Sequence, residues 1–236
     1  MSVETGNFIR VNVRLLLKFF DEKPPESQRH ATSIVAVAGE DLGVGLLKHC
    51  LERTQSAKVK VLSGIPTIGK RNPETHQQGP YLDRWVDVVW PDGSGQLFQT
   101  EIKNLSAHAI GGRILKVDAS LEEVTRFMIE RWRSLWGSYP NIPEYAKNVL
   151  KPMKRPSEVD LSHVLQPLIV YWFALHPEGR RESFFSVDLE AGYDFSRLWF
   201  FSMSTYLRSL NEDVIELEMP IAAKRMSWLH KLFPGQ

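Results

Sequence analysis

The sequence predicts an α/β domain, in which helices and strands alternate along one chain. Two neighbouring stretches rich in β-branched and aromatic residues, 82–90 and 97–104, predict a β-hairpin, because the segment between them is dense in turn-forming residues. Apolar residues recur at helical spacing before and after this hairpin, in 31–53 and 120–136. The nearly continuous apolar run 164–175 predicts a further strand, buried at the centre of the sheet.

Composition bounds the class of protein. The 236 residues, 43% of them hydrophobic and 11% aromatic, suffice for a packed core in one large domain or in one domain with additions. The single cysteine, Cys50, excludes an internal disulfide and favours a reducing cytoplasm, and we expect it in the core. The start of the chain predicts no signal peptide, and no apolar run reaches the ~18 residues of a membrane span. We therefore expect a cytoplasmic protein that is not inserted in a membrane.

Residues 1–30 predict an N-terminal extension. The stretch 8–14 alternates like a strand, whereas 15–20 is apolar enough to turn the segment helical, so its type stays open. Two prolines and many charges in 21–30 predict a linker or loop before the core. We interpret the extension as a cover for one edge of the sheet or as an arm that forms a homodimer.

The helix within 31–53 carries a stripe of apolar residues, namely Leu42, Leu46, Leu47, Cys50 and Leu51. Glycines at positions 39, 43 and 45 each cost ~1 kcal/mol of helix propensity relative to alanine. The helix is therefore expected either to begin only at Glu40 or to pack closely against the sheet. Glu40 at such a start also suits the positive end of the helix dipole, which is a purely structural role.

A long loop before the hairpin carries candidate substrate contacts. A short strand at 58–62 is followed by loop 63–81, which is longer than the usual connection of ~4 to 6 residues. Long loops beside a reaction centre often bind substrate, and Lys70 and Arg71 lie on the part that leads into the hairpin. A solvated basic face is the alternative for such residues.

The residues after the hairpin form a second candidate for binding an anion. Backbone N–H groups freed by Gly111 and Gly112, together with Arg113, suit a phosphate. His108 suits a proton transfer, although a lone histidine is more often structural. A flexible turn explains the glycine pair equally well.

The second half of the chain predicts further elements. Ser120 and Glu123 predict a capping box at the start of the helix 120–136, and the proline-rich, basic stretch 137–156 predicts a surface excursion that suits a DNA backbone. Beyond residue 175 we expect an edge strand, a helix, a strand and a final helix, at 184–189, 194–210, 214–219 and 222–233. These elements form a C-terminal addition, 177–236, packed on the same domain.

Three acids and one lysine are expected on the predicted hairpin. Because strand residues two apart share a face, Glu101 stands beside Lys103, and Asp83 and Asp87 share one face of the partner strand. A turn centred near position 93 places each aspartate diagonal to Glu101, with Asp87 opposite Gln99. Carboxylates packed together repel, and Mg²⁺ removes this difficulty because it prefers carboxylate, water and phosphate oxygens. The group therefore indicates a phosphodiesterase site.

An acid followed by Val-Val, a turn and then Glu-Ile-Lys resembles the core of the PD-(D/E)xK nuclease superfamily, although no proline precedes either aspartate. The resemblance covers residues 31–176 and implies a restriction-endonuclease-like core, with a central mixed β-sheet flanked by helices. Residues 1–30 and 177–236 are then additions to this core. The resemblance also implies a Mg²⁺-dependent endonuclease, with Mn²⁺ as a substitute, that hydrolyses phosphodiester bonds of DNA.

The same resemblance implies a role for each residue of the motif. Asp87 and Glu101 hold the ion, with Asp83 as the alternate to Asp87, which is favoured because three apolar strand residues follow it. Glu40 takes the place of the superfamily's helix glutamate and orients a second ion or the attacking water. Lys103 assists attack at phosphorus. Weaker contacts with the DNA substrate are expected from Lys70, Arg71, His108 and Arg113.

Two other functions stay open. The net charge of +1 is lower than is typical of dedicated nucleic-acid-binding domains. This favours a non-catalytic nucleic-acid- or protein-binding module on the nuclease fold, with the acids serving as a structural ion-pair cluster. A metal-dependent hydrolase that acts on nucleotides rather than on polymers is the third hypothesis.

Overall fold

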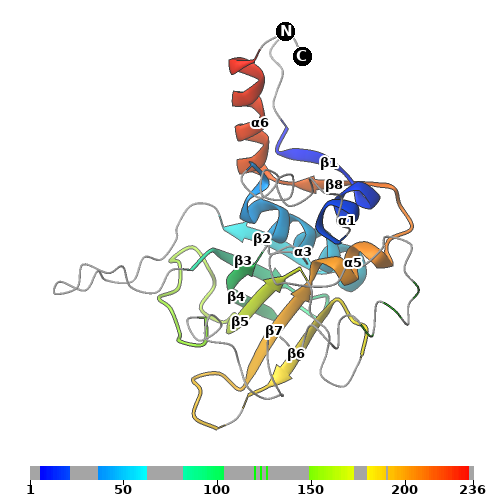
Figure 1. Ribbon diagram of the computed structural model, residues 1–236. Helices are drawn as coiled ribbons and strands as arrows, with labels where there is room; N and C mark the ends of the chain where they lie inside the picture. Colours follow the sequence, from blue (N-terminus) through cyan, green and yellow to red (C-terminus); the bar gives the residue numbers. More distant parts are fainter. Residues whose placement is uncertain are drawn as a thin grey trace, which may run out of the picture.

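The computed structural model describes residues 6–21, 37–62, 82–103, 149–172, 180–189 and 191–233, together with positions 120, 123 and 126. Within these ranges six strands form one sheet in the order β2-β3-β4-β5-β7-β6 (Figure 1). Their bounds are Lys58–Leu62 (β2), Arg84–Val89 (β3), Gly95–Lys103 (β4), Val164–Tyr171 (β5), Phe184–Asp188 (β6) and Arg197–Ser202 (β7).

The sheet is mixed. Both neighbours of β3 are antiparallel to it, β5 is parallel to both β4 and β7, and β6 lies antiparallel to β7 at one edge. The α/β class is therefore confirmed, with a mixed central sheet beside helices. The strand predicted at 58–62, the hairpin, the buried central strand and the edge strand β6 all lie where the sequence predicts them.

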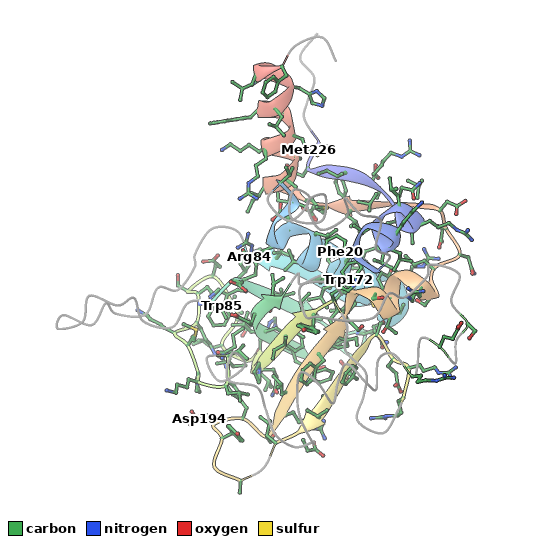
Figure 2. All side chains as sticks on the ribbon, in the orientation of Figure 1. Phe20, Arg84, Trp85, Trp172, Asp194 and Met226 are labelled. Carbon is green, nitrogen blue, oxygen red and sulfur yellow. The ribbon has the colours of Figure 1, made fainter. Side chains whose placement is uncertain are left out.

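Helices pack beside this sheet. Helix α3 (Glu40–Gln55) begins at Glu40, which is one of the two predicted alternatives, and Gly39 before it has a φ of 57° that favours glycine. Helices α1 (Val13–Asp21) and α5 (Met203–Ser209) lie near α3 (Figure 1). The ring of Phe20 on α1 stacks on Trp172 after β5, with centroids 4.2 Å apart (Figure 2). Cys50 is 1% exposed, so its predicted place in the core is confirmed.

The two ends of the chain share a small second sheet. Strand β1 (Phe8–Asn12) pairs antiparallel with β8 (Val214–Glu218), and α6 (Pro220–Leu232) follows β8 directly. The N-terminal segment contains both of the predicted alternatives, because the strand β1 leads straight into the helix α1. Its use as a dimer arm stays a prediction.

One predicted helix is wrong over its first half. The range 194–210 is not a single helix, because Arg197–Ser202 forms the strand β7 and only Met203–Ser209 is helical. The physical reason is that β7 lies between β5 and β6, where Leu198, Phe200 and Phe201 are all at most 1% exposed. A strand buried on both faces loses the alternation that distinguishes it from a helix.

Ser120 and Glu123 form the predicted capping box. The Glu123 carboxylate accepts a hydrogen bond from the Ser120 backbone N–H at 2.7 Å, and the Ser120 hydroxyl accepts one from the Glu123 N–H at 3.2 Å. Most of the helix predicted at 120–136 falls outside the described residues. None of the helices in the described ranges is long and apolar enough to cross a lipid bilayer.

The turn end of the hairpin is held by a histidine. His163, just before β5, places its ring against Gly95 at the start of β4. Its Nδ1 lies 2.6 Å from a carboxylate oxygen of Asp87 on β3. A side chain at position 95 would occupy the volume of the imidazole ring, so glycine is required there for a close approach.

Gly95→Ala is expected to lower the free energy of unfolding by about 1–3 kcal/mol, as overpacking usually does. The added Cβ would lie 1.9 Å from Cδ2 of His163 and would push the ring away from Asp87. Urea denaturation followed by tryptophan fluorescence measures the change. Gly6→Ala is the control, because a Cβ at Gly6 meets nothing within 4 Å. Equal stability of the two variants would contradict this reading of the packing.

Candidate functional site

Two carboxylates meet where β3 begins and β4 ends. The ladder pairs Arg84 with Thr100, so one further step places Asp83 opposite Glu101. The Asp83 Oδ2 accepts a hydrogen bond from the backbone N–H of Ile102 at 2.7 Å, which holds this carboxylate against β4. Glu101 is only 8% exposed. Asp83 therefore lies directly beside the Glu-Ile-Lys segment.

The predicted register of the hairpin is wrong by two residues. Asp87 pairs with Leu97 and not with Gln99, so it lies four positions along β4 from Glu101 and is not diagonal to it. The cause is the turn, in which the N–H of Trp90 donates to the carbonyl of Ser94 at 2.9 Å. This bond centres the turn one residue earlier than expected, and such a shift moves the register by two. Asp87 is instead paired with His163.

Glu40 belongs to the same end of the sheet. Arg84, the first residue of β3, forms an ion pair with the Glu40 carboxylate and lies 3.7 Å from that of Asp41, next to the start of α3 (Figure 2). Burial raises the pKa of Glu40, the Arg84 guanidinium lowers it, and the charges of Asp83 and Asp41 raise it. The net direction is upward, so the ion pair does not offset the burial of this carboxylate. We call the end formed by Glu40, Asp83 and Glu101 the acidic end of the sheet.

Asp41 attaches α6 to this end. The Asp41 side chain is buried, and its Oδ2 accepts hydrogen bonds from the N–H groups of Ile221 at 2.6 Å and Ala222 at 2.9 Å. N–H groups in the first turn of a helix have no acceptor within that helix, so Asp41 caps α6 from a distant part of the chain. The sequence gives no local signal for this contact, because the two partners are separated by 180 positions.

Gln99 brings a basic segment to the face that carries Glu101. Its buried side chain donates to the carbonyls of Val149 and Lys151 and accepts from the N–H of Met153 at 3.1 Å. Because Gln99 and Glu101 are two apart on β4, the chain around Lys151 lies over the same face of the sheet. Lys151 and Lys154 are exposed there. Sequence reasoning missed Gln99, whose signal is a polar side chain on a buried strand that must find partners.

The remaining predicted residues are placed only in part. Lys103 is the last residue of β4, and the structure describes its backbone. Four weaker candidates fall outside the described residues, so their roles stay predictions: Lys70, Arg71, His108 and Arg113.

The donor atoms at the acidic end suit a hard divalent cation. In the described part of the chain, no three His, Cys, Asp or Glu side chains converge as in a complete protein-only metal site. Mg²⁺ does not need one, because it commonly takes one or two carboxylates and fills its other positions with water and substrate phosphate. Asp83 and Glu101 supply two such carboxylates, which fits Mg²⁺ or Mn²⁺ rather than zinc.

Comparison with known proteins adds no relative to this picture. No protein-family model, no curated protein and no solved structure matches the chain.

Glu40→Gln is expected to leave the free energy of unfolding at pH 7 unchanged or slightly raised. A raised pKa means that the folded state binds the proton more tightly than the unfolded chain, so ionised Glu40 costs stability as pH rises above its usual value of 4.5. The glutamine removes that cost, and the decline of stability above this pH should become shallower. Urea titrations across this pH range measure both effects.

Asp41→Asn is the matched control for Glu40→Gln. It weakens two hydrogen bonds from backbone N–H groups to a buried carboxylate, and we expect a loss of about 1.5–3 kcal/mol. If Glu40→Gln destabilised the protein as much as Asp41→Asn, the Glu40–Arg84 ion pair would be a structural support, and the interpretation of the raised pKa would be wrong.

Proposed function

We propose that this protein is a Mg²⁺-dependent nuclease that hydrolyses phosphodiester bonds of DNA at the acidic end of the sheet. The observation that carries the proposal is the contact between the Asp83 carboxylate and the backbone of the Glu101–Lys103 segment. It brings an acid just before one strand to the segment of the next strand that contains Glu101 and Lys103, and these are the residue types that the resemblance to PD-(D/E)xK nucleases implies.

The order of the elements supports the same proposal. Helix α3 is followed by β2, by the hairpin β3–β4 and, further along the chain, by β5 parallel to β4. For residues 31–176 the resemblance implies the order helix, strand, hairpin, helix and strand. The described elements follow this order, and the helix expected between the hairpin and β5 lies mostly outside the described residues. We therefore propose a restriction-endonuclease-like core over residues 31–176, to which 1–30 and 177–236 are additions. Two strands of the C-terminal addition, β7 and β6, extend the sheet beyond β5.

Each residue has a proposed part in the reaction. Asp83 and Glu101 hold the divalent ion, with Asp83 in the role that the sequence first suggested for Asp87. When bound, such an ion neutralises charge on the phosphate and makes a coordinated water easier to deprotonate. Lys103, two positions after Glu101, assists the attack at phosphorus. Glu40, held by Arg84, orients the attacking water or a second ion.

Contacts with the DNA backbone are proposed for the basic segment beside Gln99. Lys151 and Lys154 are exposed over the sheet face that carries Glu101, and lysines there attract a phosphate backbone even though the whole chain carries a net charge of only +1. Lys70, Arg71, His108 and Arg113 remain predicted contacts of the same kind. The homodimer likewise remains a prediction.

One observation favours the alternative of a non-catalytic binding module on the same fold. Arg84 contacts both Glu40 and Asp41, so part of the acidic end is already a structural ion-pair cluster. A module of this kind would bind nucleic acid or protein without cutting it. Measurements of metal binding and of DNA cleavage distinguish the nuclease from the non-catalytic module.

Alanine at Asp83, Glu101 or Lys103 is expected to reduce Mg²⁺-dependent cleavage of DNA by about a hundredfold or more, as loss of a central electrostatic group usually does. Linear, circular, branched and single-stranded DNA should each be incubated with Mg²⁺ and with Mn²⁺, beside mononucleotides. Asp87→Asn is the matched control, and we expect it to retain activity because Asp87 faces Leu97 and His163. The proposal loses its basis if the wild type cuts no nucleic acid, or if Asp87→Asn is inactive while Asp83→Ala is active.

Calorimetric titration with Mn²⁺ tests the ion site without an activity assay. The wild type and Asp87→Asn are expected to bind the ion at one stoichiometric site, and Asp83→Ala and Glu101→Ala are expected to lose it, because each removes a carboxylate ligand. Circular dichroism checks that the variants are folded. Absence of any binding by the wild type would favour the non-catalytic module.

A further inference from the structure

Helix α6 projects from the body of the protein. Its base is fixed by Asp41, which binds the first turn, and by a hydrogen bond from Arg225 in the second turn to the carbonyl of Val37 at 3.1 Å. Beyond this base the helix extends away from β8 with the start of β1 beside it (Figure 1), and Ala222 is its one buried residue. Figure 2 shows Met226 halfway along this projection. A helix that buries so little of itself adds little to the core, which points to a partner outside the described chain.

The charge of α6 indicates the chemistry of that partner. Residues 220–232 contain no acid, whereas four basic residues lie among them, namely Lys224, Arg225, His230 and Lys231. All four are exposed. A projecting element of one charge sign is complementary to a polyanion.

An exposed tryptophan stands among these cations. Trp228 is 60% exposed. On a helix, residues three and four positions apart are neighbours, so Lys224, Arg225 and Lys231 all border its indole ring. An open aromatic surface surrounded by positive charge is the arrangement by which proteins bind single-stranded nucleic acid, with a base on the ring and phosphates on the cations.

A hollow on the other side of Lys231 extends this surface. It lies between α6 and the β1 segment, and its lining includes Phe8, Arg10, His230 and Lys231 but no acidic residue. Glu216 is the cross-strand neighbour of Arg10 on the small sheet, whereas residues 220–232 of α6 contain no acid. The hollow gives a nucleotide next to Trp228 a second place to lie.

The base of α6 adjoins the acidic end of the sheet. Asp41, which caps α6, is the residue after Glu40 and lies near Arg84. Arg225 donates to the carbonyl of Val37, three residues before Glu40, so the foot of the helix lies beside the start of α3. A nucleic-acid strand bound along α6 toward its base therefore arrives beside Glu40.

We propose that α6 is an arm that binds a single-stranded segment of the nucleic-acid substrate, with a base stacked on Trp228 and phosphates on Lys224 and Lys231. This inference rests on the proposed nuclease function, since it concerns the substrate of that site. A membrane surface fits less well, because an interfacial helix lies in the plane of the bilayer whereas α6 is fixed by one end. A second copy of α6 would bring like charges together.

The test measures binding apart from cleavage. A fluorescein-labelled oligodeoxythymidylate is titrated with the full chain in EDTA, where no Mg²⁺-dependent cutting occurs, and its anisotropy gives Kd. Trp228→Ala is expected to weaken binding about tenfold, which corresponds to about 1.4 kcal/mol, and Trp228→Phe to restore most of it. An abasic oligonucleotide should bind wild type and Trp228→Ala equally.

Leu232→Ala is the matched control, because Leu232 is an exposed apolar residue of the same helix, 68% accessible, and carries no ring. Its Kd should equal that of the wild type. Lys231→Ala should lower the slope of log K against log salt by about 0.7, the value for one phosphate contact on a single strand. Equal effects of Trp228→Ala and Leu232→Ala would indicate an apolar docking face and overturn the proposal.

Two further measurements test for other partners. Sedimentation with phosphatidylserine vesicles and sedimentation velocity of the protein alone are run on the wild type and on Trp228→Ala. If Trp228 governs vesicle binding or self-association and leaves oligonucleotide binding unchanged, the proposal is overturned. If the wild type cuts DNA and Trp228→Ala changes neither binding nor cutting, the arm alone is refuted. If Trp228 governs oligonucleotide binding and no DNA is cut, the arm stands and the nuclease function fails.

Discussion

The register between β3 and β4 is the constraint on which the acidic end of the sheet depends. It is set by the turn between the strands, where Trp90 and Ser94 are joined by a backbone hydrogen bond and Asp92 accepts hydrogen bonds from both the N–H and the hydroxyl of Ser94. These bonds lower the pKa of Asp92 and therefore favour its ionised form in the folded turn. Because strand side chains alternate with a period of two, a turn centred one residue later would still leave the acids on one face but would exchange their neighbours. The turn thus decides which aspartate meets Glu101.

The sequence predicts the parts of this structure that depend on local pattern. Hydrophobic alternation locates β2 and the hairpin, Ser120 and Glu123 predict their own capping box, and Gly39 marks the place where α3 begins. What it does not predict depends on contacts between distant residues. The pattern of β7 predicts a helix because this strand is buried on both faces, and the choice between the two aspartates requires a turn geometry that composition alone does not specify. The candidate ligands of the proposed ion therefore depend on the register, whereas the Glu-Ile-Lys segment is visible in the sequence itself.

Arg84 connects three elements through one guanidinium group. It begins β3, pairs with Glu40 at the start of α3 and lies near Asp41, which in turn caps α6. The two acids are consecutive in the sequence but differ in environment. Asp41 is nearly fully buried and accepts hydrogen bonds from two backbone N–H groups of α6, whereas the pKa of Glu40 is raised, chiefly by burial, despite the arginine. Asp41 thus has a structural role, and a carboxylate such as Glu40, whose ionised form costs stability, is better explained by a role in function.

Asp83 and Asp87 also differ in environment, although they lie close together in the sequence. They are four residues apart on β3 or immediately before it, and each lies against β4 or β5 through one specific contact. The Asp87 carboxylate is hydrogen-bonded to the His163 ring, at 2.6 Å from Nδ1. Asp83 faces Glu101, and two acids placed opposite each other raise the electrostatic energy of the folded state unless a cation reduces it. Glu40 and Asp41 lie at the same end of the sheet, so negative charge is concentrated there. Exposed lysines lie nearby on the segment held by Gln99. A divalent ion together with a phosphate backbone would balance both sets of charges at once.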